Sequence, residues 1–279
     1  MIVDAVLIVG GLGLLFAVLI ALANLKLRVY EDPRIDAVAA MLPNNNCGAC
    51  GQPGCRAFAE QAVLGRIVPA QCSVLDAEGV AAVAAYLGVD AGSAVKRVAR
   101  LHCAGGSNVA RRDAEYRGLE TCAAANAVSG GGKACAWGCL GFGDCAVVCD
   151  FDAIRMNDFG IPVVDPLRCT ACGDCVVACP KDLFTILPLD AQLLVQCRNL
   201  VEGDEVRALC SVACTACGKC VLDAPAGLIS VQSGVAVIDY GRIDEANEAA
   251  IVRCPTGAIV WVDGAQFATI DSPVRGIAL

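Results

Sequence analysis

Residues 135–180 read CAWGCLGFGDCAVVCDFDAIRMNDFGIPVVDPLRCTACGDCVVACP, a stretch in which eight cysteines fall into two groups. The first group is spaced C-x3-C-x5-C-x3-C and the second C-x2-C-x2-C-x3-C-P. In the second spacing, three close thiolates hold one 4Fe-4S cube and the fourth thiolate ligates a neighbouring cube. The spacing therefore predicts two cubes, one on Cys149, Cys169, Cys172 and Cys175 and the other on Cys135, Cys139, Cys145 and Cys179.

A similar arrangement follows about 75 residues later, so this region contains an internal repeat. In the first copy, strand-like residues 153–156 and 161–164 flank a turn. In the second copy, residues 228–231 and 235–238 flank Ser233-Gly234 in the same way. Both segments predict β-hairpins, and with the cysteine runs they indicate tandem bacterial ferredoxin-like modules.

The second copy has lost half of its ligands. Its C-x2-C-x2-C run is intact, but Ala224 stands where the fourth cysteine is expected, and its far half keeps a single cysteine before Pro255. A two-cluster module needs both halves for its second cube, so we expect this copy to hold one cube. Its predicted ligands are Cys214, Cys217, Cys220 and Cys254.

The composition of the chain agrees with metal clusters. Twenty cysteines in 279 residues require a disulfide framework or clusters, and the tight repeated spacing favours clusters. A net charge of -8 argues against a nucleic-acid partner, because phosphate binding needs clustered Lys and Arg. A single histidine argues against His-ligated zinc catalysis.

The N-terminus predicts a membrane anchor. Residues 5–23 carry no charge, and this length approaches the roughly twenty residues that a helix needs to cross the hydrocarbon core. A cleaved signal peptide is the alternative, because Ala21-Leu22-Ala23 imitates a cleavage site, but Asp4 and the lack of a basic n-region favour an uncleaved anchor. Three basic residues follow the apolar run: Lys26, Arg28 and Arg34. The positive-inside rule then predicts a single span with everything after residue 25 in the cytoplasm.

A separate cysteine cluster follows the anchor. The motif CGACGQPGC at residues 47–55, with one further cysteine downstream, supplies Cys47, Cys50, Cys55 and Cys72. Residues 56–64 and 76–87 have helical composition, with Asp76 as an N-cap and Gly88 as a stop. We expect a small helical 4Fe-4S domain here; a four-cysteine zinc site is the alternative, since C-x2-C pairs also bind zinc.

Four cysteines remain after these sixteen: Cys103, Cys122, Cys197 and Cys210. Four is the number that one more cube requires, so a fifth cluster is one interpretation. The other is that some are buried structural thiols, or that Cys210 competes with Cys214 as a ligand. Residues 96–117 are locally basic, which indicates either a docking face for an acidic ferredoxin or an ordinary solvated surface.

The order of apolar helix, CGACGQPGC motif and ferredoxin repeats resembles the B subunit of the Rnf ion-translocating electron-transport complex, over essentially the whole chain. The resemblance implies a membrane-anchored iron–sulfur relay of a ferredoxin:NAD oxidoreductase, in a bacterial or archaeal cytoplasmic membrane. It implies as partners soluble ferredoxin and the membrane and flavin-bearing subunits of that complex. The relay does no bond chemistry itself, and neither a GxGxxG after a strand nor a P-loop occurs in the sequence.

The predicted fold is therefore α+β, in five parts: a transmembrane anchor (1–28), a small helical 4Fe-4S domain (29–92), a linker with unassigned cysteines (93–133), a two-cluster ferredoxin-like module (134–190) and a degenerate one-cluster module (191–279). It holds four 4Fe-4S clusters, or five if the remaining cysteines form another. Two other functions fit the same pattern: a polyferredoxin subunit of another redox enzyme such as a hydrogenase, and a zinc-stabilised interaction protein.

Overall fold

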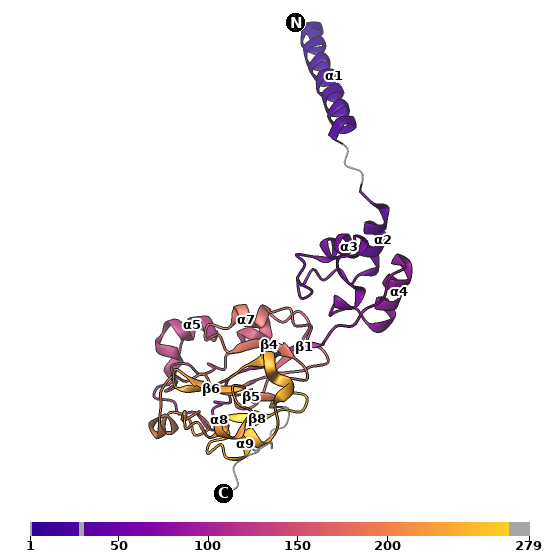
Figure 1. Ribbon diagram of the computed structural model, residues 1–279. Helices are drawn as coiled ribbons and strands as arrows, with labels where there is room; N and C mark the ends of the chain where they lie inside the picture. Colours follow the sequence, from indigo (N-terminus) through magenta and orange to yellow (C-terminus); the bar gives the residue numbers. More distant parts are fainter. Residues whose placement is uncertain (1, 28–30, 268–279) are drawn as a thin grey trace.

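The computed structural model describes residues 2–27 and 31–267 (Figure 1). Its first element, α1 (Ile2–Leu27), has 26 residues, which at 1.5 Å per residue gives about 39 Å, more than the roughly 30 Å of a hydrocarbon core. Within α1, the segment Val6–Leu27 has a mean hydropathy of 2.9 and buries none of its most apolar window against the rest of the chain. This helix is therefore long and apolar enough to span a membrane, as the sequence predicted. Lys26 lies in its last turn, whereas Arg28 is outside the described residues.

Three helices and a short 3-10 turn form the small helical domain: α2 (Pro33–Met41), α3 (Cys55–Val63), η1 (Pro69–Gln71) and α4 (Ala77–Leu87). They close around a core that includes Val38, Phe58 and Val83. The predicted ends of α4 are confirmed, because the Asp76 carboxylate accepts a hydrogen bond from the Gly79 N–H at 2.8 Å and Gly88 adopts φ +66°.

Helix α2 lies in a stretch that the sequence analysis did not assign to a helix. Its N-cap is Asp32, whose side chain accepts from the Arg34 N–H at 2.9 Å, and Pro33 occupies the first helical position. The dipeptide Asp32-Pro33 is therefore a local sequence signal for the start of this helix.

The first ferredoxin-like module consists of two two-stranded antiparallel sheets with short helices beside them. Strand β1 (Arg97–Leu101) pairs with β4 (Phe184–Pro188), and β2 (Ile154–Met156) pairs with β3 (Pro162–Val164). The hairpin of β2 and β3 was predicted; the outer pair was not. The helical segments are α5 (Cys122–Ala127), η2 (Ser129–Gly132), α6 (Asp144–Val147) and α7 (Asp174–Ala178).

The second module repeats this plan. Strand β5 (Leu193–Val195) pairs with β8 (Ile259–Trp261), and the predicted hairpin forms from β6 (Ile229–Gln232) and β7 (Val235–Ile238). Its helical segments are η3 (Asp204–Ala208), α8 (Lys219–Asp223), η4 (Tyr240–Glu245) and α9 (Ala249–Val252). The starts of α6 and α8 are 75 residues apart, as are those of α7 and α9 and those of β4 and β8. The internal repeat read from the sequence is therefore a repeat of structure.

Residues 93–133 carry more structure than the linker expected for them. Strand β1 lies in this segment and pairs with β4 of the first module. The residues after β1 contact the second module: the Ala104 N–H donates to the Gln196 carbonyl at 3.0 Å, and the Arg111 N–H donates to the Leu209 carbonyl at 2.9 Å. The segment is also not a continuous basic face. Arg100 is only 2% exposed, and Arg111 forms an ion pair with Asp113.

Candidate iron–sulfur sites

The twenty cysteines, all of them described by the structure and none in a disulfide, lie on five cavities with four cysteines on each. We name the cavities the N-terminal site (Cys47, Cys50, Cys55, Cys72), the outer site (Cys149, Cys169, Cys172, Cys175), the inner site (Cys122, Cys139, Cys145, Cys179), the central site (Cys103, Cys135, Cys197, Cys210) and the C-terminal site (Cys214, Cys217, Cys220, Cys254). Their volumes are about 320–380 Å³.

The sulfurs are spread around each cavity. Within residues 2–27 and 31–267, no three His, Cys, Asp or Glu side chains converge closely enough to share a single metal ion. Four thiolates on one zinc ion meet at a point, whereas a cube presents one iron at each of four corners and needs its ligands farther apart. The arrangement thus fits a cube at each site.

The N-terminal site brings together the four cysteines predicted for it. Gly48 and Gly51 adopt φ of +70° and +80°, a conformation that lets the loop turn sharply around the cavity. The side-chain oxygen of Asn46 accepts from the Cys55 N–H at 2.9 Å, and the side-chain amide of Gln71 donates to the Cys50 carbonyl at 3.3 Å. The loop is therefore fixed at two of its cysteines.

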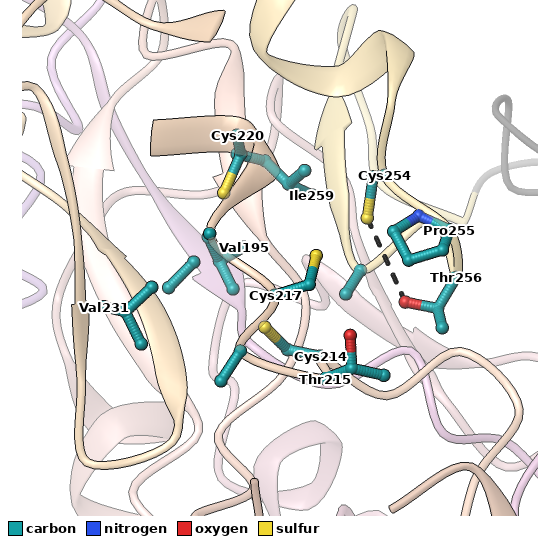
Figure 2. Close-up of a pocket in the computed structure, with 14 residues that line it drawn as sticks. Val195, Cys214, Thr215, Cys217, Cys220, Val231, Cys254, Pro255, Thr256 and Ile259 are labelled. Carbon is teal, nitrogen blue, oxygen red and sulfur yellow. Dashed lines mark hydrogen bonds between the residues drawn. The ribbon is translucent and has the colours of Figure 1, made fainter. Parts of the chain in front are cut away.

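The outer and C-terminal sites also contain the predicted sets. At the outer site, the Ala153 N–H donates to the Cys149 sulfur at 3.3 Å, and the Ala99 N–H of β1 lies 3.5 Å from the Cys169 sulfur. Figure 2 shows the four cysteines of the C-terminal site pointing toward a common space, with the Cys254 sulfur 3.9 Å from the Thr256 hydroxyl. These polar contacts reach the sulfurs without filling the cavity.

The inner and central sites differ from the grouping expected from spacing at two cysteines. Cys135 was expected with Cys139, Cys145 and Cys179, but it lines the central cavity. Cys122, expected among the unassigned four, takes its place at the inner site. The unassigned cysteines therefore do not form a set by themselves.

A carboxylate explains why Cys122 lies at the inner site. Asp144 begins α6, and its two oxygens accept the main-chain N–H groups of Cys122 (2.8 Å) and Ala123 (3.0 Å) at the start of α5. This holds the N-terminus of α5 against α6, which carries the inner-site cysteine Cys145. The contact spans 22 residues, so spacing alone did not reveal it.

The central site lies between the modules, and each module supplies an equivalent pair of cysteines. Cys103 follows β1 by two residues, as Cys197 follows β5. The N–H two residues further on donates to each of these sulfurs at 3.4 Å. Cys135 and Cys210 are 75 residues apart, the offset of the repeat, and each stands in a C-x3-C pair. The C-x3-C spacing that Cys135 and Cys210 share, at equivalent positions of the repeat, is the sequence signal that these two cysteines have equivalent places in the two modules.

Burial raises the pKa of most of these thiols. It raises the pKa of Cys145, Cys175 and Cys197 to about 12, with neighbouring cysteines adding to the shift in each case. The pKa of Cys139 is raised further still, again chiefly by burial. A free thiol in these positions keeps its proton at neutral pH, and because the thiolate is the iron ligand, metal binding must displace protons.

Adjacent sites touch, so the five form one series. The Ser73 hydroxyl beside the N-terminal site donates to the Thr170 carbonyl of the outer site at 2.8 Å. The outer and inner sites are both lined by residues of α7, β2 and β4. The Cys139 N–H of the inner site donates to the Cys103 sulfur of the central site at 3.3 Å. Burial raises the pKa of the central Cys197, and a hydrogen bond from the main chain of Cys214 in the C-terminal site opposes that shift.

Comparison with known proteins agrees with this geometry. Residues 42–74 match the family model described as a putative Fe-S cluster, and residues 134–183 match a 4Fe-4S dicluster domain. These matches and the four-cysteine cavities define the class: an iron–sulfur protein with ferredoxin-type modules.

Long relatives identify the family. The B subunit of the Na(+)-translocating ferredoxin:NAD(+) oxidoreductase complex of Acetobacterium woodii is 46% identical over 252 residues, 90% of this chain and 75% of the relative. The B subunit of the proton-translocating complex of Clostridium ljungdahlii is 38% identical over 89% of this chain and 88% of the relative. The B subunit of an ion-translocating oxidoreductase complex of Methanosarcina acetivorans is 34% identical over 92% and 97%. The chain belongs to the family of B subunits of Rnf-type ion-translocating oxidoreductase complexes, which confirms the resemblance.

Proposed function

We propose that this protein is the membrane-anchored electron-relay subunit of an ion-translocating ferredoxin:NAD oxidoreductase, and that it holds five 4Fe-4S cubes. The observation that carries the proposal is that all twenty cysteines divide into five sets of four on adjoining cavities. A protein that stored iron or used one zinc site for stability would have no need for a connected series.

Each cube, when bound, accepts and releases one electron without breaking a bond. The polypeptide does the rest. Its thiolates hold the irons, main-chain N–H groups such as those of Gly105 and Asn199 stabilise negative charge on the sulfurs, and buried apolar side chains keep water away. The contacts between adjacent sites give the relay its order: N-terminal, outer, inner, central and C-terminal, or the reverse.

The partners follow from the family. We propose that the other subunits of the complex, including flavin-bearing ones, surround this chain, and that soluble ferredoxin exchanges electrons with one end of the series. The relatives from Acetobacterium woodii and Clostridium ljungdahlii are named for different ions, so their names transfer no coupling ion to this chain. We propose that α1 anchors the chain in the membrane and that Lys26 in its last turn keeps the cluster-bearing part on the cytoplasmic side.

Metal analysis of the anaerobically purified full-length protein tests the proposal. Five cubes give about 20 iron and about 20 acid-labile sulfide per chain, and four cubes give about 16 of each. Reduced samples should show EPR signals of interacting clusters. A colourless protein with zinc and little iron would refute the relay, and co-purification with a nickel enzyme in place of flavin-bearing membrane subunits would assign it to a hydrogenase.

A further inference from the structure

Lys133 is a cation placed among cysteines of two sites. Its ammonium group donates to the carbonyl of Gly105 and, at 2.6 Å, to the carbonyl of Cys139. The side chain lines the central cavity, while Cys139 belongs to the inner site. The ammonium therefore stands at the junction between the two sites, partly shielded from solvent.

The backbone around Lys133 is built to present this side chain. Gly132 adopts φ +76°, and a Cβ there would lie 2.2 Å from the main-chain oxygen of Ala114. Lys133 itself pairs with Arg112 in an isolated bridge. A Cβ on Gly138 would lie 2.9 Å from Cε of Lys133, so the lysine stem packs directly against this glycine. The close packing at Gly132 restrains the backbone that carries Lys133, and the two carbonyl acceptors hold its ammonium.

Lys133 makes no ion pair with a carboxylate of residues 2–27 or 31–267. Among the residues that the structure describes, no Asp or Glu oxygen lies within ion-pairing distance of its ammonium. Its charge acts on three thiols. Burial raises the pKa of Cys135, Cys139 and Cys210, and the charge of Lys133 opposes that shift at all three. An ammonium withdrawn from water is costly unless an anion compensates it, which points to an anionic group in the cavity.

We propose that Lys133 is the counter-charge of the central cube and raises its reduction potential above that of the same cube without the lysine. The proposal rests on the proposed function, because it requires a cube on Cys103, Cys135, Cys197 and Cys210. Four thiolates make the cube anionic, and reduction adds one more negative charge. A fixed cation nearby stabilises the reduced form more than the oxidised form. An electron crossing between the modules is therefore held more favourably at the central site.

The test is an EPR-monitored redox titration of the iron-loaded full-length protein. The central signal is the one that disappears in Cys210→Ala. In Lys133→Met, which keeps the length and removes the charge, we expect that signal to titrate at lower potential. The equilibrium constant for reduction should fall roughly tenfold, about 59 mV for a one-electron couple. Lys133→Arg keeps the charge and should keep the potential near that of the parent. The matched control is Lys96→Met, since Lys96 is exposed and its ammonium also donates to a carbonyl, that of Leu167, at 3.1 Å.

An unchanged reduction potential in Lys133→Met with full iron content would overturn the proposal, and so would an equal downward shift of the potential in Lys133→Arg. Loss of one cube's iron in Lys133→Met would also overturn it, because the lysine would then be a structural support of the site. Failure of the proposed five-cube relay looks different, because it appears in the parent protein itself, as little iron or as the absence of any EPR signal that Cys210→Ala removes. A lowered potential with iron and sulfide unchanged, absent in Lys96→Met, supports the role of the charge.

Discussion

Double substitution of cysteines distinguishes the observed grouping of ligands from the one that spacing suggests. Cys135 and Cys210 line the central cavity, whereas Cys139 lines the inner one. Spacing instead places Cys135 with Cys139 and leaves Cys210 outside their set. We would compare a variant that combines Cys135→Ala with Cys210→Ala against a variant that combines Cys135→Ala with Cys139→Ala. Cys135 and Cys210 are 8% and 7% exposed, so the first variant removes two equally buried thiols.

The expected iron contents follow from the site membership. Starting from about 20 iron per chain, each single variant loses one cube and retains about 16. Removing Cys135 and Cys210 together takes two ligands from one cube, so this double variant also retains about 16. Removing Cys135 and Cys139 together takes one ligand from each of two cubes, so this double variant retains about 12. If Cys135 were an inner-site ligand, the two values would be exchanged.

Iron and acid-labile sulfide would be measured on anaerobically purified full-length protein. EPR of the reduced samples would show whether Cys135→Ala and Cys210→Ala abolish the same signal, which the shared central site requires. Retention of about 16 iron in the Cys135 and Cys139 double variant, with about 12 in the Cys135 and Cys210 variant, would refute the regrouping.

Three further predictions concern the supports of the series. Gly132→Ala should lower the thermal unfolding midpoint much more than Gly130→Ala. Both glycines have positive φ, but only at Gly132 would the new Cβ meet a main-chain oxygen, at 2.2 Å. Equal unfolding midpoints for the two variants would contradict this prediction. Ser73→Ala removes the hydrogen bond to Thr170, worth about 1 kcal/mol. It should weaken the magnetic interaction between the N-terminal and outer clusters at unchanged iron content. Ser211→Ala should not do so, because the Ser211 hydroxyl also donates to a main-chain carbonyl, that of Val109 at 3.5 Å, but away from these two sites. Deleting α1 should move the protein from the membrane fraction to the soluble fraction with its iron intact. Continued membrane retention would contradict α1 as the sole anchor, and iron loss would contradict a purely anchoring role for this helix.

Local signals in the sequence were sufficient for several elements. The uncharged run at residues 5–23 predicted α1, and Asp76 and Gly88 predicted both ends of α4. The hairpins at residues 154–164 and 229–238 followed from strand-like runs around a turn. In each of these elements, the residues that decide the structure lie within a few positions of one another, so the pattern and the contact coincide.

Strands β1 and β5 were not predicted because their partners are distant. Arg97 pairs with Pro188, and Leu193 pairs with Trp261, so each strand is stabilised by a segment that follows it by dozens of residues. Arg97 and Arg100 of β1 belong to the locally basic stretch 96–117, which the sequence analysis interpreted as a docking face or a solvated surface. The burial of β1 depends on its pairing with β4. Arg100 is buried there because its guanidinium donates hydrogen bonds to the main-chain carbonyls of Gly264 and Leu189. Pairing over such distances leaves no local signature in a single sequence.

The ligand sets show the same division. The cysteines that spacing groups for the N-terminal, outer and C-terminal sites line one cavity each. Spacing places Cys135 with Cys139 and leaves Cys122 unassigned, whereas the cavities exchange these two cysteines. The repeat explains why. Each module carries a cysteine two residues after its first strand and another at the start of a C-x3-C pair, Cys103 and Cys135 in one and Cys197 and Cys210 in the other. Neither pair completes a cube alone, so the two modules supply one site only when they pack together. The central site therefore depends on the interface that it bridges, and binding of a cube there should stabilise the packing of the two modules on each other.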